Sequence, residues 1–220
     1  MTGSAPRVAF VHTGAVVIPP VMDLARQHLP EATTVNYLDD KIVPDLADPE
    51  RAASVPARLE GLVGAARDAG ADLVMLTCSS ISTLAAPTAR AVGVPVLRID
   101  EAMADAAVAA GARIAVLATL PTTCAPTTGL IEERAALAGR SPTITSEIVD
   151  GAFAAVSSGD RSSHDRLVAE AIERVARDCD VVVLAQASMA SAAAAVVVEV
   201  PVLTSLEPGI RRLREAVDEL

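Results

Sequence analysis

A cysteine lies in a polar turn between two predicted elements, where a thiol could do chemistry. Cys78 is part of the sequence TCSS at 77–80, which follows an apolar run at 73–76 and precedes a helical stretch that starts near Ser82. Amides at a helix N-terminus carry partial positive charge, which lowers the pKa of a nearby thiol. The position therefore favours a nucleophile or a proton-transferring group. The alternative is a small buried cysteine with a structural role.

A second polar segment is rich in threonine. Residues 119–128 read TLPTTCAPTT, with five threonines and the candidate thiol Cys124. Together with the helix start that should follow, these hydroxyls could hold an anion. The segment contains neither Lys nor Arg, which favours a carboxylate over a phosphate. The alternative is an ordinary Pro/Thr loop whose side chains cap a helix.

The remaining histidines and cysteines are weaker candidates. His12 follows a predicted strand and could be a base or a substrate donor, although a lone histidine is more often structural. We expect His28 and His164 to be solvated on helices. Cys179 opens a strand at the end opposite the predicted site, so we expect it to lie in the core.

Strands must position these residues, and the sequence alternates short β-branched runs with Ala-rich helical stretches. This alternation predicts an α/β fold with parallel strands joined by right-handed crossovers. The predicted strands are 8–11, 33–38, 73–76, 96–99, 114–118, 144–149, 181–185 and 202–204. The predicted helices are 20–28, 52–69, 82–91, 102–110, 129–138, 163–177, 189–198 and 209–219.

The two halves of the chain resemble each other. VAFVHT at 8–13 matches IAVLAT at 114–119, and PVL at 95–97 recurs at 201–203, both at an offset of 106 residues. This repeat predicts a duplication that gives two pseudo-symmetric α/β lobes with an active site in the cleft between them. We assign 1–105 to the first lobe, completed by the helix at 207–220, and 106–206 to the second. Ligands are expected beyond the carboxyl ends of the strands.

Composition excludes several classes of function. The formal net charge of −10 disfavours sequence-independent nucleic-acid binding, which needs a basic surface. The longest apolar stretch, 192–198, is too short for a membrane span. Three cysteines without a CxxC spacing predict neither a disulfide framework nor a zinc site. We therefore expect a cytoplasmic protein with reduced thiols, no metal and no membrane or nucleic-acid partner.

Over essentially its whole length, the chain resembles the aspartate/glutamate/hydantoin racemase superfamily. The resemblance rests on the duplicated halves, on TCSS at 77–80 and on ATLPTT at 118–123. It implies two lobes that enclose a small carboxylate substrate. It also implies two cysteines, one per lobe, that flank the carbon α to the carboxylate. One cysteine removes the proton and the other returns it to the opposite face, without cofactor or metal.

The second half departs from this pattern. Cys78 matches the first family cysteine, but the turn that should carry the second reads LAQASM at 184–189, so Gln186 takes its place. An amide cannot remove a proton, and the Ser188 hydroxyl has too high a pKa without an activating partner. The superfamily also contains members that resemble arylmalonate decarboxylase, in which one thiol suffices, and a maleate isomerase branch. A two-base racemase would need Cys124, His12 or Ser188.

The sequence thus predicts a cofactor-independent racemase- or isomerase-type enzyme with Cys78 as the thiol acid/base. A single-cysteine decarboxylase of a malonate-type acid is the alternative, and a non-catalytic protein that binds small acids is a further one. With three aromatic residues in the chain, the substrate is expected to be aliphatic. A homo-oligomer is expected on the resemblance alone. The predicted substrate-binding residues are Thr13, Thr77, Ser79, Ser80, Thr119, Thr122 and Thr123.

Overall fold

The computed structural model describes residues 5–220 and divides the chain into two units. The first unit comprises the chain up to Ile99 together with Leu206–Leu220, and the second comprises Asp100–Ser205. The segment 100–105, which the repeat assigns to the first lobe, belongs to the second unit in the structure. Residues 1–4 of the predicted first lobe lie outside the described residues.

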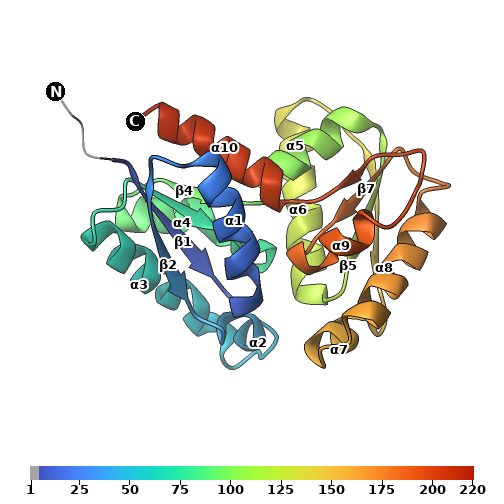
Figure 1. Ribbon diagram of the computed structural model, residues 1–220, viewed down its shortest axis with the longest axis horizontal. Helices are drawn as coiled ribbons and strands as arrows, with labels where there is room; N and C mark the ends of the chain where they lie inside the picture. Colours follow the sequence, from blue (N-terminus) through green and yellow to red (C-terminus); the bar gives the residue numbers. More distant parts are fainter. Residues whose placement is uncertain (1–4) are drawn as a thin grey trace. The chain divides into compact units, whose positions relative to one another are not determined.

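The first unit is a four-stranded parallel sheet with helices on both faces (Figure 1). The strand order is β2-β1-β3-β4, so β1 and β3 occupy the centre of the sheet. One face packs on α2, α3 and α4, and α1 and α10 lie side by side in the same unit. The strands are β1 (Arg7–His12), β2 (Thr33–Leu38), β3 (Leu73–Leu76) and β4 (Val96–Arg98). The α-helices are α1 (Ile18–His28), α2 (Ile42–Leu46), α3 (Val55–Asp68), α4 (Ala85–Val92) and α10 (Leu206–Asp218).

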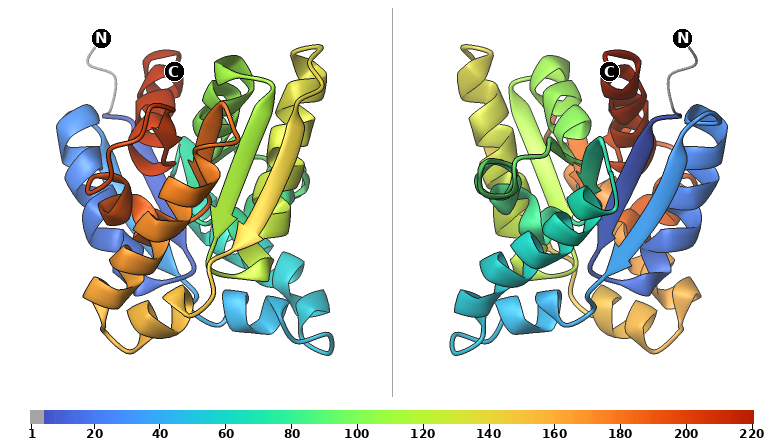
Figure 2. Two further views of the ribbon diagram at one scale, coloured as in Figure 1. Left: turned by 90° about the vertical axis from the view of Figure 1, so that its right-hand side faces the viewer. Right: turned by 90° about the vertical axis from the view of Figure 1, so that its left-hand side faces the viewer.

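The second unit repeats this topology. Its strand order is β6-β5-β7-β8, all parallel, and β6 forms one edge (Figure 2). Helices α5 and α6 pack on one face of the sheet, and α7, α8 and α9 pack on the other. The strands are β5 (Arg113–Ala118), β6 (Thr143–Ile148), β7 (Val181–Leu184) and β8 (Val202–Leu203). The α-helices are α5 (Glu101–Ala110), α6 (Pro121–Leu137), α7 (Ala152–Ser157), α8 (Arg161–Val175) and α9 (Ala190–Ala193).

Apolar side chains on both faces explain why the central strands form. Every residue of β3 and of β7 is buried, as expected for strands covered by helices on both faces. Helix α3 contributes Leu59 and Val63 to the core of the first unit, at the four-residue spacing that places side chains on one helix face. The two parallel sheets confirm the predicted α/β class.

Short 3₁₀ helices connect some of these elements. They are η1 (Ala15–Val17), η2 (Ala52–Ser54), η3 (Ser79–Leu84) and η4 (Ala187–Met189). Two of them, η3 and η4, directly follow the turns after β3 and β7, which carry Cys78 and Gln186. Helices η3 and η4 therefore form the start of the helical segment that the sequence predicts after each of these two strands.

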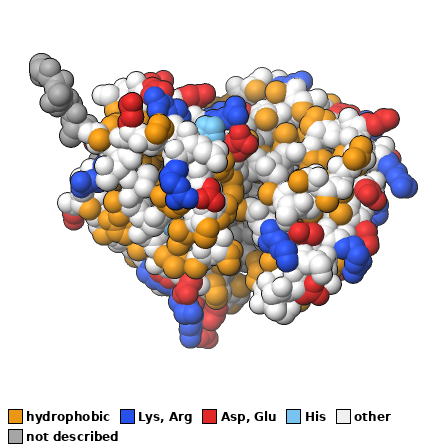
Figure 3. Space-filling model, viewed as in Figure 1, with side chains coloured by type: hydrophobic (Ala, Val, Ile, Leu, Met, Phe, Trp, Pro, Cys, Tyr) orange, Lys and Arg blue, Asp and Glu red, His pale blue; other side chains and the backbone are white. Residues whose placement is uncertain are grey.

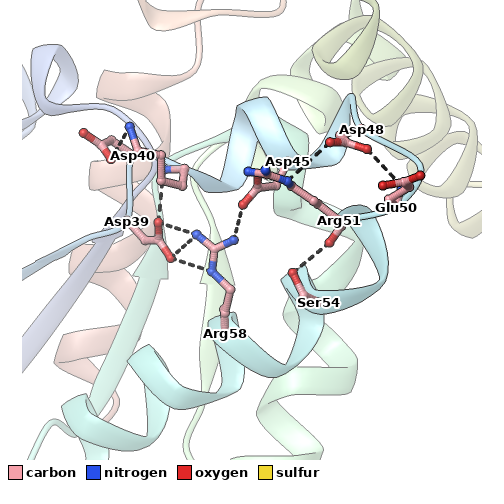
Figure 4. Close-up of polar contacts among 9 residues, drawn as sticks. Asp39, Asp40, Asp45, Asp48, Glu50, Arg51, Ser54 and Arg58 are labelled. Atoms are coloured by element: carbon pink, nitrogen blue, oxygen red, sulfur yellow. Dashed lines mark hydrogen bonds and ion pairs between the residues drawn. The ribbon is translucent and has the colours of Figure 1, made fainter.

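An ion-pair cluster ties the segment after β2 to α3 (Figure 4). The Arg58 guanidinium donates to Asp39, with an Nε–Oδ2 distance of 2.9 Å, and also to Asp45. Arg51 lies 3.6 Å from Asp45 and extends the cluster. Hydrogen bonds from the guanidinium to the two carboxylates raise the pKa of Arg58 above its usual range. The cluster fixes the polypeptide at the carboxyl end of β2.

Charged side chains of both signs share the surface. On the face drawn in Figure 3, acidic and basic groups lie beside one another among apolar side chains. Within residues 5–220, no helix has both the length and the apolar character that crossing a membrane requires.

Candidate active site

Cys78 lies where β3 gives way to a helix. It has extended backbone angles (φ −133°, ψ 124°) and directly precedes η3, and its side chain is half-buried. The α-helix begins at Ala85 rather than near Ser82, because Pro87 has no N–H and fits best in the first turn of an α-helix. The predicted junction of strand, cysteine and helix is therefore present, with a 3₁₀ segment between the thiol and α4.

A buried histidine supports the residue that precedes this cysteine. His12 ends β1, and its Nδ1 lies 2.8 Å from Thr77 Oγ1. Its Nε2 lies 2.8 Å from Asn36 Oδ1, and Thr77 Oγ1 lies 3.1 Å from the Val11 carbonyl oxygen. Both ring nitrogens of this fully buried histidine thus have partners within the first unit.

Burial also determines the charge of this ring. Loss of solvent lowers the pKa of His12 below its usual range, and the hydrogen bond with Asn36 opposes this shift without cancelling it. The imidazole is therefore neutral at pH 7. These contacts suit a group that holds Thr77 and Asn36 in place more than one that reaches a substrate.

Gln186 is the counterpart of Cys78 in the second unit. Leu76 pairs with Val11 in the first sheet, and Leu184 pairs with Leu117 at the same point of the second sheet. Gln186 and Cys78 are each two residues beyond these paired strand positions. Gln186 has nearly the same backbone angles as Cys78 (φ −131°, ψ 140°) and directly precedes η4. The amide therefore lies at the position of the second sheet that is equivalent to the position of Cys78 in the first sheet.

The Gln186 side chain is hydrogen-bonded to the end of β5. The backbone N–H of Thr119 donates to Gln186 Oε1 at 2.5 Å, and the Thr119 hydroxyl lies 3.0 Å from the same oxygen. Thr119 is buried, whereas Gln186 is partly exposed. The structure thus brings two of the predicted site residues together within the second unit.

The threonine-rich segment is mostly helix and not a loop. Helix α6 begins at Pro121, so it includes Thr122, Thr123 and Cys124. Two prolines in ten residues are typical of a loop, but Pro121 occupies the first turn, where no N–H is needed, and Pro126 lies inside the helix. Thr123 is buried, and Thr122 is partly exposed in the first turn.

The other candidate site residues differ in burial and in the unit to which they belong. Thr13, Ser79 and Ser80 are buried at strand ends of the first unit, and Ser188 is partly exposed in η4. Cys124 belongs to the core between α5, α6 and the sheet, and Cys179 is buried on the other face of that sheet. The core position predicted for Cys179 is confirmed, and burial raises the pKa of its thiol.

The prediction that His164 is solvated is wrong. Its side chain is fully buried in α8, where Nδ1 lies 2.8 Å from the adjacent Asp165 carboxylate. Asp165 also accepts a hydrogen bond from Ser191 of α9, at 2.8 Å. The polar neighbours of His164 in the sequence are typical of an exposed position. Those neighbours lie on other faces of the helix, while His164 shares the buried face with Val168.

Differences in burial predict the order in which the cysteines react. Iodoacetamide at pH 7.5 should label Cys78 before Cys179, because the reactive species is the thiolate and Cys179 is both buried and raised in pKa. Peptide mass spectrometry of the folded protein at timed intervals measures the order. Faster labelling of Cys179 would remove the basis for assigning the reactive thiol to Cys78.

Comparisons with known proteins agree with this architecture. Residues 11–213 match the model of the Asp/Glu/Hydantoin racemase family. No curated protein matches the chain in a sequence search. Glutamate racemase from Francisella tularensis subsp. tularensis SCHU S4, solved with D-glutamate, superposes with a TM-score of 0.78 at 12% identity. That match covers 99% of this chain and 82% of the other.

Two further solved structures share the fold. A glutamate racemase isoform from Bacillus anthracis has a TM-score of 0.76 at 16% identity, over 99% of this chain and 83% of the other. A variant of arylmalonate decarboxylase, in a sulfate-associated form, has a TM-score of 0.61 at 18% identity. That match covers 97% of this chain and 94% of the other. At sequence identities this low, the similarity to these structures shows a shared fold and nothing more. Because the family model matches nearly the whole chain, the protein belongs to the Asp/Glu/hydantoin racemase family.

Proposed function

We propose that this protein transfers a proton at the carbon α to the carboxylate of a small acid or amino-acid derivative, without a cofactor. Cys78 is the thiol acid/base. The observation that carries this proposal is the contrast among the cysteines. Cys78 is half-buried in a turn at the carboxyl end of a central strand, whereas Cys124 and Cys179 are buried. In parallel α/β sheets, ligands bind beyond this edge.

Hydroxyls and amides at the strand ends bind the substrate carboxylate in this proposal. Thr122 lies in the first turn of α6, where the helix dipole favours an anion. The segments that follow the central strands, 13–20, 77–84, 119–128 and 185–192, contain no Lys or Arg. A carboxylate in the side chain of the substrate would therefore lack a cationic partner from these segments, which favours an acid with an aliphatic substituent. The proposed contacts are Thr13, Ser79, Ser80, Thr122 and Thr123.

The chemistry needs only one thiol. The Cys78 thiolate removes the α-proton, and the C–H electron pair moves into the enediolate of the carboxylate. The thiol then returns a proton to the carbon. Gln186 cannot accept the α-proton, so proton removal and return occur on one face of the planar intermediate.

Decarboxylation is the second candidate, and the amide at position 186 favours it. The bond from the α-carbon to the leaving carboxylate breaks, its electron pair enters the enediolate of the remaining acid, and CO₂ departs. Cys78 then donates its proton to the carbon and is reprotonated by solvent. No base is required on the second face, and the likeness in fold to arylmalonate decarboxylase is compatible with this route.

A screen of small 2-substituted acids and malonates in D₂O distinguishes these reactions. NMR and chiral analysis should show either exchange of the α-proton with retention, or loss of CO₂ with one deuterium and one configuration in excess. Gln186→Cys should add inversion, because it introduces a second thiol, at the position equivalent to Cys78, that can act as the second base. Rapid racemisation of a simple amino acid by the unmodified protein would contradict the one-base mechanism.

A further inference from the structure

We propose that Thr119 does not bind the substrate itself but orients Gln186, whose amide N–H groups bind the substrate carboxylate or enediolate. This inference rests on the proposed function for the identity of the substrate. Thr119 is then a positioning residue and not the direct substrate contact that its place after a strand predicts. All of the contacts that support it lie within the second unit.

The backbone of Thr119 fixes which way the Gln186 amide points. A backbone N–H can only donate, so the side-chain atom that it meets at 2.5 Å must be the carbonyl oxygen, Oε1. The Thr119 hydroxyl lies 3.0 Å from the same oxygen and provides a second donor. With Oε1 held by two donors, the NH₂ group of Gln186 is directed away from Thr119.

Burial determines which hydrogen-bond donors remain accessible to a ligand at this strand end. Thr119 is 4% exposed, and its backbone N–H and its hydroxyl both donate to Gln186 Oε1. Gln186 is partly exposed at the turn after β7. A carboxylate at this strand end therefore meets the Gln186 N–H donors, provided that the amide keeps its orientation.

The chemistry of the amide suits this role. Its N–H groups can donate to a carboxylate or an enediolate, and such hydrogen bonds to charged acceptors are stronger than neutral ones. The same amide neither takes nor releases a proton near pH 7. Gln186 thus stabilises negative charge at the position equivalent to Cys78 without acting as a second base.

NMR of the whole protein with sodium acetate as the probe tests the orientation without knowledge of the substrate. Acetate should shift the side-chain NH₂ signals of Gln186, while the Thr119 amide proton stays hydrogen-bonded to Oε1. If acetate instead breaks the hydrogen bond between the Thr119 amide and Gln186 Oε1 and accepts from the Thr119 amide itself, the inference is wrong. A Gln186 NH₂ signal that does not respond to acetate also overturns it.

A double-mutant cycle on acetate affinity then separates positioning from contact. Thr119→Val removes the hydroxyl and keeps the backbone N–H, and we expect it to weaken acetate binding about 3- to 10-fold. In a Gln186→Met background the same substitution should have no further effect, because Thr119 acts through Gln186. Additive losses would show that Thr119 contacts the carboxylate directly.

Two further variants keep the test decisive. Thr122→Val is the matched control, because a residue that contacts the carboxylate independently should lose affinity equally in both backgrounds. Gln186→Glu preserves the side-chain shape and the oxygens that accept from Thr119 but removes the donors, so acetate binding should be lost even if Gln186→Met folds poorly. Retained acetate binding in folded Gln186→Glu would refute the donor role. The proposed reaction at Cys78 can fail without changing any of these acetate results, so the two hypotheses are tested separately.

Discussion

Cys78→Ala is expected to lower kcat by about 10²- to 10⁴-fold, the range that positioned acid/base groups contribute. Alanine cannot transfer a proton, and the half-buried turn position should accept the smaller side chain with little change in fold. Deuterium incorporation from D₂O into the substrate identified by the screen measures the loss. A circular dichroism spectrum and a thermal melt verify that the variant is folded.

The matched control for this experiment is Cys179→Ala. Cys179 is buried in the core at the amino end of β7, so its replacement should lower stability and leave turnover per folded molecule unchanged. Full activity of folded Cys78→Ala would exclude the thiol from the reaction.

Gly209→Ala is expected to destabilise the protein by about 1–3 kcal/mol, the usual cost of overpacking. Gly209 is buried in α10, and a Cβ at this position would lie 2.2 Å from the Ile99 carbonyl oxygen. A backbone atom cannot rotate away, so α10 or the end of the first sheet must shift. Urea unfolding followed by circular dichroism gives the free energy of unfolding.

Gly61→Ala provides the internal control. Gly61 is exposed in the middle of α3, and a Cβ at this position would have no atom within 4 Å. Alanine has a helix propensity about 1 kcal/mol better than glycine, so this substitution should stabilise the protein. If both substitutions stabilise it, the close approach of α10 to Ile99 does not limit the packing of the first unit.

Strand positions were the most predictable part of this fold. β2 and β3 have the boundaries that the apolar pattern predicts, and the other strands differ by one or two residues. Buried strands are continuous apolar runs, a signal that is local in sequence. Two short helices, α2 and α7, were missed, because five or six residues contain too few turns to show a helical period.

The site was predictable where it depends on local sequence. The turn at Cys78 and its counterpart at Gln186 follow from the repeat and the strand ends. The contact between Thr119 and Gln186 joins residues 67 apart, and that between His12 and Thr77 joins residues 65 apart. A side-chain hydrogen bond over such a separation depends on strand order and rotamer, and a single sequence carries no signal for it.

Helices α5 and α10 are exchanged between the two units of the chain. Each of these helices follows the last strand of one unit and completes the other: α5 comes after β4 and belongs to the second unit, and α10 comes after β8 and belongs to the first. This is the connectivity of a domain-swapped homodimer whose two half-length subunits became fused.

The order of the segments also affects folding during synthesis. The second unit is continuous in sequence and can fold as it emerges from the ribosome. The first unit must wait, with the surface for α10 uncovered, until the whole of Asp100–Ser205 has been synthesised.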